Sequence, residues 1–245
     1  MKVYTIPQSV KEIVGGAFAN LSKLEQINFE GISIVNQNVV GSCNLTTIGD
    51  YAFDGCISLN SIIIPSTVNS IGNYAFRSAY SLESINIDAD NSMLLKVGEG
   101  AFVDCMDALT ISYDSNNEAQ YVKLGNVLVS YVGDATELVL DNTITAIADG
   151  AFNRTITDNN ATNYQLSQLT VGAESALTYI GKNVFLSCAS LNEIYILTES
   201  KVNIEENSFN GIALSAVLYV NSSIIDDYKA DDNYLVFEED NILGA

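Results

Sequence analysis

The chain has 245 residues, and 30 Asp plus Glu against 10 Lys plus Arg give it a formal net charge of −20 and a pI near 4.1. This charge repels the phosphates of nucleic acids and anionic membrane surfaces, which argues against both as partners. The chain contains no histidine, which removes the Ser-His-Asp triad and the histidine-based zinc sites. No apolar run reaches the roughly 18 residues of a transmembrane helix.

A motif with an Ala-Phe step at its centre recurs along the chain. The clearest copy spans residues 64–87 and contains Ala75 and Phe76. A period in the twenties is typical of leucine-rich-repeat solenoids, in which each repeat forms one coil that stacks on the next. Seven phenylalanines mark the copies and are separated by 35, 23, 26, 50, 33 and 24 residues: Phe18, Phe53, Phe76, Phe102, Phe152, Phe185 and Phe209.

Each unit contains a strand pattern after its Phe. The residues nine and eleven positions further on are mostly Ile, as in Ile85 and Ile87, and their neighbours are mostly polar. This alternation predicts a strand with one buried face, and stacked coils would join such strands into a parallel sheet. The Ala-Phe step is expected on the opposite wall, where the ring fills the interior. Burying such a ring contributes about 1.5–3 kcal/mol.

The pattern I-P-x-x-V-x-x-I-G-x-x-A-F-x-x-C-x-x-L-x-x-I-x-I resembles the BspA-like (treponemal-type) leucine-rich repeats. Residues 6–29, 45–87 and 177–196 match it best. The segments 126–131 and 138–140 also resemble the hairpin insertion of that family. The resemblance implies an exported surface protein of host-associated anaerobic bacteria or some protists, with a role in adhesion and protein binding.

The predicted fold is a mostly β leucine-rich-repeat solenoid of the α/β class. We expect a right-handed coil with a parallel strand ladder on the concave wall and short helical turns or irregular structure on the convex wall. Residues 1–221 would form about seven irregular units, with a hairpin insertion near 113–135 and a loop insertion near 153–165. Residues 222–245 would form a C-terminal cap of the same domain.

In chain order, a first unit at 6–29 is followed by an insertion at 29–44 and two near-ideal units at 45–87. The core pattern continues through 94–102 and 138–152, resumes at Leu166, and closes at Val220. In the cap, Ser222 and Ser223 are expected to cap a short helix that continues through Asp226, Asp227, Tyr228 and Ala230. The side chains expected to cover the end of the solenoid are Tyr234, Val236 and Phe237.

The sequence predicts neither a catalytic residue nor a metal or cofactor. The four cysteines, Cys43, Cys56, Cys105 and Cys188, lack metal-site spacing and are expected to be buried free thiols. Asp88, Asp90, Ser92 and Glu99 match four positions of an EF-hand loop, but Met93 stands where glycine is required, so a solvated acidic bulge is favoured.

The predicted binding surface is the outward side of the strand ladder. Its middle is small and polar, and its C-terminal end is more apolar, with Tyr195 and Leu197 beside Leu218 as an anchor of the kind found at interface hot spots. The alternative is an ordinary solvated sheet surface. The protein-binding candidates are Asn28, Ile63, Asn86, Ser112, Glu193, Tyr195, Leu197 and Leu218.

Together these features predict an exported or cell-surface scaffold that is a monomer and binds a protein ligand such as a host extracellular or surface protein. No nucleic acid, membrane insertion or catalysis is expected. The chain would be a mature or shortened segment whose leader and anchor are absent. A structural spacer within a larger surface protein is the alternative. A carbohydrate-active domain is a remote one, because histidine is absent and acid pairs such as Asp226-Asp227 and Glu238-Glu239 lie in the tail with no evident pocket.

Overall fold

The computed structural model describes residues 2–35, 38–88, 92–105, 108–113, 119–153, 165–186 and 188–245. The chain divides into two compact units. Unit 1 consists of Met1–Ile111 and Val122–Val127, and unit 2 consists of Ser112–Tyr121 and Leu128–Ala245. The single solenoid expected over 1–221 remains a prediction.

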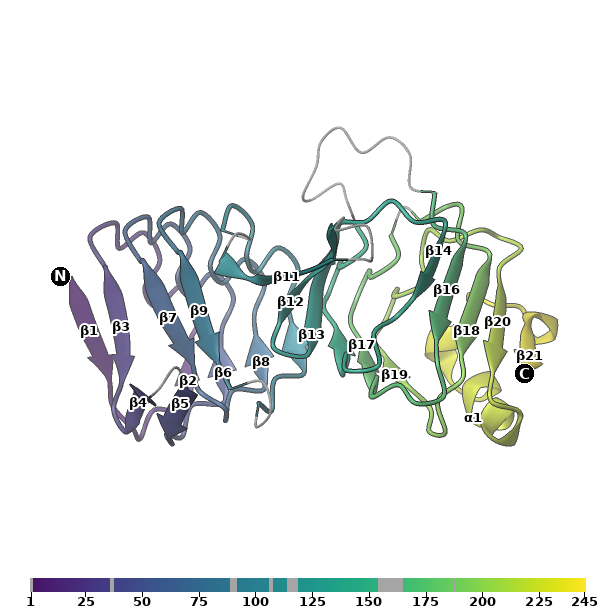
Figure 1. The fold of residues 1–245 in the computed structure, drawn as a ribbon, viewed down its shortest axis with the longest axis horizontal. Coiled ribbons are helices and arrows are strands. Elements are labelled where there is room, and N and C mark those ends of the chain that lie inside the picture. The colour runs from purple at the N-terminus through teal and green to yellow at the C-terminus, as the bar shows by residue number, and fades with distance from the viewer. Residues whose placement is uncertain are drawn as a thin grey trace. The chain divides into compact units, whose positions relative to one another are not determined.

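Unit 1 is a parallel β-solenoid whose coils each contribute one long and one short strand (Figure 1). The long strands form a four-stranded sheet in the order β1-β3-β7-β9, with bounds β1 Val3–Ile6, β3 Gln26–Phe29, β7 Ser61–Ile64 and β9 Ser84–Ile87. The short strands form a second sheet in the order β10-β8-β6-β2, with bounds β2 Glu12–Ile13, β6 Thr47–Ile48, β8 Ser70–Ile71 and β10 Lys96–Val97.

The insertion at 29–44 contains an antiparallel hairpin of β4 (Ile32–Val35) and β5 (Asn38–Gly41). Further along the chain are β11 (Thr110–Tyr113) and β12 (Ala119–Leu124). Most of the expected loop insertion at 153–165, and Asp90 of the EF-hand-like motif, lie outside the described residues.

Unit 2 repeats the two-sheet plan. Its long strands follow the order β14-β16-β18-β20-β21, with bounds β14 Glu137–Val139, β16 Gln168–Val171, β18 Glu193–Ile196, β20 Val217–Val220 and β21 Ile242–Gly244. The other strands follow the order β13-β15-β17-β19, with bounds β13 Val127–Tyr131, β15 Ala146–Ile147, β17 Tyr179–Ile180 and β19 Asn203–Ile204. The mostly β, leucine-rich-repeat solenoid predicted from the sequence is confirmed.

The phenylalanine rings stack along the wall that carries the Ala-Phe steps. In unit 1 the centroids of Phe53 and Phe76 are 5.1 Å apart, and those of Phe76 and Phe102 are 5.3 Å apart. Six of the seven marker rings are at most 1 % exposed, whereas Phe18 in the first coil is half-buried. In unit 2, Tyr131 stacks on Phe152 at 4.9 Å and takes the place of a phenylalanine in the series.

The turn that carries each marker Phe begins with a residue whose backbone is in the left-handed conformation. The residue two positions before every marker Phe has a φ between 52° and 68°. Only glycine adopts this conformation without a steric cost, and Asn tolerates it better than most residues. Two tyrosines adopt it nevertheless, so the stacked wall imposes the turn on the sequence. The seven residues are Gly16, Tyr51, Tyr74, Gly100, Gly150, Asn183 and Asn207.

The cysteines are free and buried, as predicted. Three thiols donate to the carbonyl oxygen of the marker Phe in an earlier coil: Cys56 to Phe18 at 3.1 Å, Cys105 to Phe76 at 3.3 Å and Cys188 to Phe152 at 3.8 Å. Burial raises the pKa of Cys56 to about 11 and the pKa of Cys105 and of Cys188 to about 12. These thiols are therefore structural.

The end of unit 2 is covered by the helix α1 (Ile225–Lys229) and three 3-10 turns, Ser222–Ile224, Asp232–Tyr234 and Glu239–Asn241. Tyr228, Tyr234 and Phe237 are buried, but Val236 is 45 % exposed, so its predicted covering role is wrong. The first turn is capped by the side chain of Asn221, one residue before the predicted serines. The final strand β21 was not predicted.

Candidate functional site

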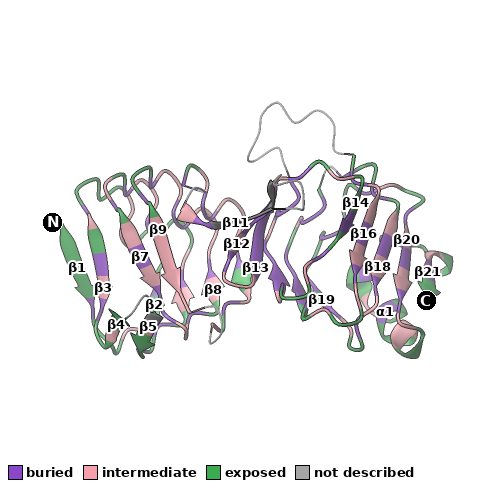
Figure 2. Ribbon diagram, in the orientation of Figure 1, coloured by how far each residue is buried: buried purple, intermediate pink, exposed green. Residues whose placement is uncertain are grey.

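The outward side of the long-strand sheet in unit 2 carries the candidate site. In β16, β18 and β20, residues alternate between half-buried and buried, so one set faces the core and the other faces solvent (Figure 2). The strands pair in register, which places Thr170, Tyr195 and Tyr219 side by side. Val139 precedes Thr170 in this row, and Leu243 follows Tyr219. We call Val139, Thr170, Tyr195, Tyr219 and Leu243 the outer row.

Leu218 is not part of this surface, which corrects the prediction. Its side chain is fully buried, and it pairs with the core residue Ile194. Leu218 lies nine positions after Phe209, and the residues at the matching position in other units, Ile27, Ile62 and Ile194, are buried as well. The outward residue of β20 is Tyr219, which the sequence analysis missed and which the same count would have found.

Tyr195 and Tyr219 form a stacked pair. Their ring centroids are 4.5 Å apart, and the ring planes are 8° from parallel. The Tyr195 hydroxyl donates a hydrogen bond to Glu193 Oε2 at 3.2 Å. Partial burial raises the pKa of Tyr195, and Glu193 and Tyr219 raise it further. The phenol therefore stays neutral at physiological pH, and the pair offers both apolar area and hydroxyl groups.

The outer row has exposed aliphatic groups on both sides of the tyrosine pair. Val139 is 70 % exposed and Leu243 is 41 % exposed. Leu197 follows β18 and is half-buried, with its amide donating to the Val171 carbonyl at 2.9 Å. Exposed Val and Leu beside stacked tyrosines make a surface of the composition found in protein interfaces.

The remaining predicted residues fall in other places. Asn28, Ile63 and Asn86 are half-buried on the long strands of unit 1, where Ile63 pairs with Asn86 and Asn28 accepts a hydrogen bond from Gln26 at 2.7 Å. Ser112 lies on β11, within the part of unit 2 whose side chains are outside the description. Unit 1 and unit 2 each contain part of the predicted set: apolar Ile63 lies in unit 1, and Tyr195 and Leu197 lie in unit 2.

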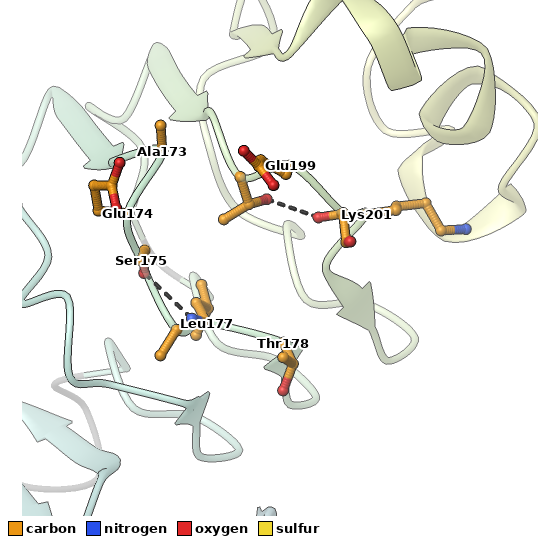
Figure 3. Close-up of a pocket in the computed structure, with 10 residues that line it drawn as sticks. Ala173, Glu174, Ser175, Leu177, Thr178, Glu199 and Lys201 are labelled. Atoms are coloured by element: carbon orange, nitrogen blue, oxygen red, sulfur yellow. Dashed lines mark hydrogen bonds between the residues drawn. The ribbon is translucent and has the colours of Figure 1, made fainter.

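A hollow of about 380 Å³ lies between residues 173–178 and 198–201 (Figure 3). Each of its two loops has an internal hydrogen bond: the Leu177 amide donates to the Ser175 hydroxyl at 3.2 Å, and the Thr198 hydroxyl donates to the Ser200 carbonyl at 2.8 Å. These bonds stabilise the loops themselves, so the hollow has the character of a groove between two turns.

A second hollow borders the cap and is lined by Asp227, Asp231, Asp232 and Lys201. Lys201 Nζ and Asp231 Oδ2 are 2.7 Å apart. Burial alone would raise the pKa of Asp231, but the hydrogen bonds and charge of Lys201 and the Asn233 amide lower it overall. This ion pair links the cap to the loop after β18.

Among the residues that the structure describes, no group of three or more Cys, Asp or Glu side chains is arranged to hold a metal ion. None of the helices in the described part of the chain has the length and apolar character needed to cross a bilayer.

The repeat pattern matches the family described as the BspA type leucine rich repeat region, in six copies over residues 1–48, 33–159 and 126–229. The chain belongs to this family. A comparison with curated proteins finds no match.

Several solved structures resemble the chain. The leucine-rich repeat protein TpLRR of T. pallidum is 21 % identical, with 85 % of this chain and 75 % of that one covered and a TM-score of 0.40. The pneumococcal vaccine antigen PcpA is 20 % identical, with 89 % and 62 % covered and a TM-score of 0.39. A leucine-rich cell surface protein of Faecalibacterium prausnitzii is 16 % identical, with 100 % and 79 % covered and a TM-score of 0.32.

Proposed function

We propose that this chain is an extracellular or cell-surface scaffold that binds a protein partner through the outer row of unit 2. The observation that carries the proposal is the stacked pair of Tyr195 and Tyr219 on the solvent-facing side of the sheet. Tyrosine is among the residues that contribute most to protein interfaces, because it combines a large apolar ring with a polar end.

The surroundings of the pair support this assignment. An exposed Val139 at one side and an exposed Leu243 at the other extend the apolar surface along one row. In contrast, three of the four outward residues of β7 and β9 in unit 1, Ser61, Ser84 and Asn86, are small and polar, and the fourth is the half-buried Ile63. A partner would gain more from burying the row in unit 2 than the matching face of unit 1.

The proposal includes adhesion or host interaction as the biological role, by analogy with the repeat family, and no catalytic activity. A structural spacer is the second candidate, favoured by the small polar face of unit 1. The binding scaffold and the spacer predict different results. If the chain is a spacer, no substitution of a surface residue abolishes capture of a partner.

The test is capture from an extracellular-matrix or mucosal extract with three forms of the chain. The wild type is compared with Tyr195→Asp/Tyr219→Asp and with Asn28→Asp/Asn86→Asp, which adds the same charge to the face of unit 1. Circular dichroism verifies that all three are folded. We expect the tyrosine double variant to lose proteins that both other forms retain. Identical captured sets from all three forms would remove the outer row as the binding surface and favour the spacer.

A further inference from the structure

The outer row has a short side chain at Thr170, beside the long side chain of Tyr195. In-register pairing of β14, β16 and β18 places Thr170 between Val139 and Tyr195 on the solvent-facing side. Neighbouring strands are about 4.8 Å apart, so Val139 and Tyr195 are separated by about 10 Å. A threonine side chain is much shorter than a tyrosine. We call the space above Thr170, between Val139 and the Tyr195 ring, the Thr170 step.

The Tyr195 ring forms one wall of this step. Stacking on Tyr219, with ring planes 8° from parallel, fixes its orientation on one side. The hydrogen bond from its hydroxyl to Glu193 fixes the outer end of the ring. Its other face is therefore turned toward Thr170. A planar group above Thr170 could continue the stack, since aromatic planes attract a further planar group at such spacings.

The charges around the step are acidic. The neighbouring outward row begins with Glu137, Gln168 and Glu193 and continues to Val217; Glu137 pairs with Gln168, and Gln168 pairs with Glu193. Glu137 is exposed, and Gln168 Nε2 donates to the Thr170 hydroxyl at 3.5 Å. Two carboxylates thus flank the amide beside the step, on a chain with a net charge of −20. A cationic group gains from this field, whereas an anionic group is repelled.

Resting on the proposed function, we propose that the Thr170 step receives an arginine side chain from a basic segment of the partner protein. The guanidinium lies flat on the free face of the Tyr195 ring and donates to Glu137 and Glu193, while its methylene stem covers Val139. Arginine can stack on the ring and bind the carboxylates at the same time, because its planar cation packs against aromatic faces and donates hydrogen bonds in its own plane. Lysine has a compact ammonium that meets only the charge requirement.

The test uses three acetylated peptides of sequence Gly-Ser-X-Ser-Gly, in which X is arginine, citrulline or phenylalanine. Citrulline keeps the planar shape of arginine and removes its charge. The full chain is labelled with 3-fluorotyrosine, and the Tyr195 signal is assigned by its loss in Tyr195→Phe. We expect the arginine peptide to shift the Tyr195 signal and to bind about tenfold more tightly than the citrulline peptide, with the difference shrinking as salt is added.

Two sets of variants locate the effect. Thr170→Phe fills the step, and Glu137→Gln/Glu193→Gln removes its charge while keeping shape. Each is expected to weaken arginine-peptide binding about tenfold, the scale of one lost cation–π or charge-assisted contact. The matched controls, Asn86→Phe and Glu12→Gln/Glu83→Gln, make the same changes in unit 1 and should leave binding unaltered. If circular dichroism shows that Thr170→Phe is misfolded, the Glu137→Gln/Glu193→Gln variant alone tests the proposal.

Equal affinity for the arginine and citrulline peptides overturns the proposal, as does the absence of any Tyr195 shift with the arginine peptide. Tighter binding of the phenylalanine peptide overturns it too, because the step would then favour an apolar side chain. Failure of this inference is distinguishable from failure of the proposed function. If capture from the extract still depends on Tyr195 and Tyr219, the outer row binds a partner without the arginine. If capture does not depend on them, the proposed function itself fails.

Discussion

Arg77 and Asp54, which lie 23 positions apart in neighbouring coils of unit 1, form a two-point ion pair. Arg77 Nε donates to Asp54 Oδ1 at 2.8 Å, and Nη2 donates to Oδ2 at 2.7 Å. The guanidinium carbon is also 5.3 Å from the ring centroid of Tyr51 and 5.4 Å from that of Tyr74. One side chain therefore connects two coils and covers the two tyrosines that have positive φ.

The geometry predicts that Arg77→Lys destabilises unit 1, because lysine cannot donate two parallel hydrogen bonds or stack as a plane. We expect a lower midpoint of thermal unfolding than for the wild type, measured by circular dichroism. Lys182→Met is the control, since Lys182 makes a single exposed contact with Glu206, and such pairs contribute about 0–1 kcal/mol. If Arg77→Lys lowers the midpoint no more than this control, the ion pair has no special role.

The ring stack predicts a large cost for truncating Phe76. Its side chain is fully buried between Phe53 and Phe102, at centroid distances of 5.1 and 5.3 Å. Phe76→Ala should lower the free energy of unfolding by about 3–5 kcal/mol, through lost burial and the cavity that remains. Urea denaturation measures this loss. Phe18→Ala in the half-buried first ring should cost clearly less, and equal costs at both positions would contradict the stack as the basis of stability.

The sequence alone was sufficient to predict the structural features that recur in every coil. The alternation that includes Ile194 and Ile196 predicted the inward side of the long strands, and both residues are fully buried. The marker phenylalanines predicted the stacked wall for the same reason: a buried position must be apolar in every coil. These features follow from local periodicity, which a single sequence displays.

Features that occur once were harder to predict. The ring position held by Tyr131 carries no Ala-Phe step, so nothing in the repeat pattern marked it. Val236 was assigned to the core because it is apolar, whereas the cap buries Tyr228 instead. The apolar row in unit 2 depends on strand register between distant segments. Tyr195 meets Tyr219 only because β18 and β20 pair without a shift, and Leu218 was misplaced by one position.

The buried thiols predict a loss of stability at alkaline pH. Burial raises the pKa of Cys105 to about 12, whereas a thiol in the unfolded chain titrates near its ordinary value of about 8.5. Above that value the unfolded state releases a proton that the folded state retains, so the free energy of unfolding falls as pH rises toward 12. The slope reaches about 1.4 kcal/mol per pH unit for each such thiol.

Cys105→Ser tests this dependence, because serine keeps a hydrogen-bond donor near the Phe76 carbonyl but does not titrate in this range. Urea denaturation at pH 8, 9 and 10 should show a shallower alkaline decline for the variant than for the wild type. The other ionisable groups are the same in both chains, so they cancel in the comparison. Parallel declines would mean that Cys105 ionises as readily in the folded chain as in the unfolded one.

The close approach of neighbouring coils predicts that Gly72 cannot be replaced without cost. A Cβ atom at Gly72 would lie 2.7 Å from the carbonyl carbon of Gly49 and would also collide with the backbone nitrogen of Asp50. Both are backbone atoms held by the coil, so Gly72→Ala should destabilise unit 1 by about 1–3 kcal/mol, as overpacking does.

Gly172→Ala is the matched control for Gly72→Ala, since a Cβ there would meet only Asn142 Oδ1, at 3.7 Å. This substitution should be neutral or stabilising by about 0.4–1 kcal/mol, because alanine restricts the unfolded chain. Urea denaturation of both variants measures the difference. A tolerated alanine at Gly72 would show that consecutive coils can separate at this wall, and the spacing of the Phe53 and Phe76 rings would then not be set by backbone contact.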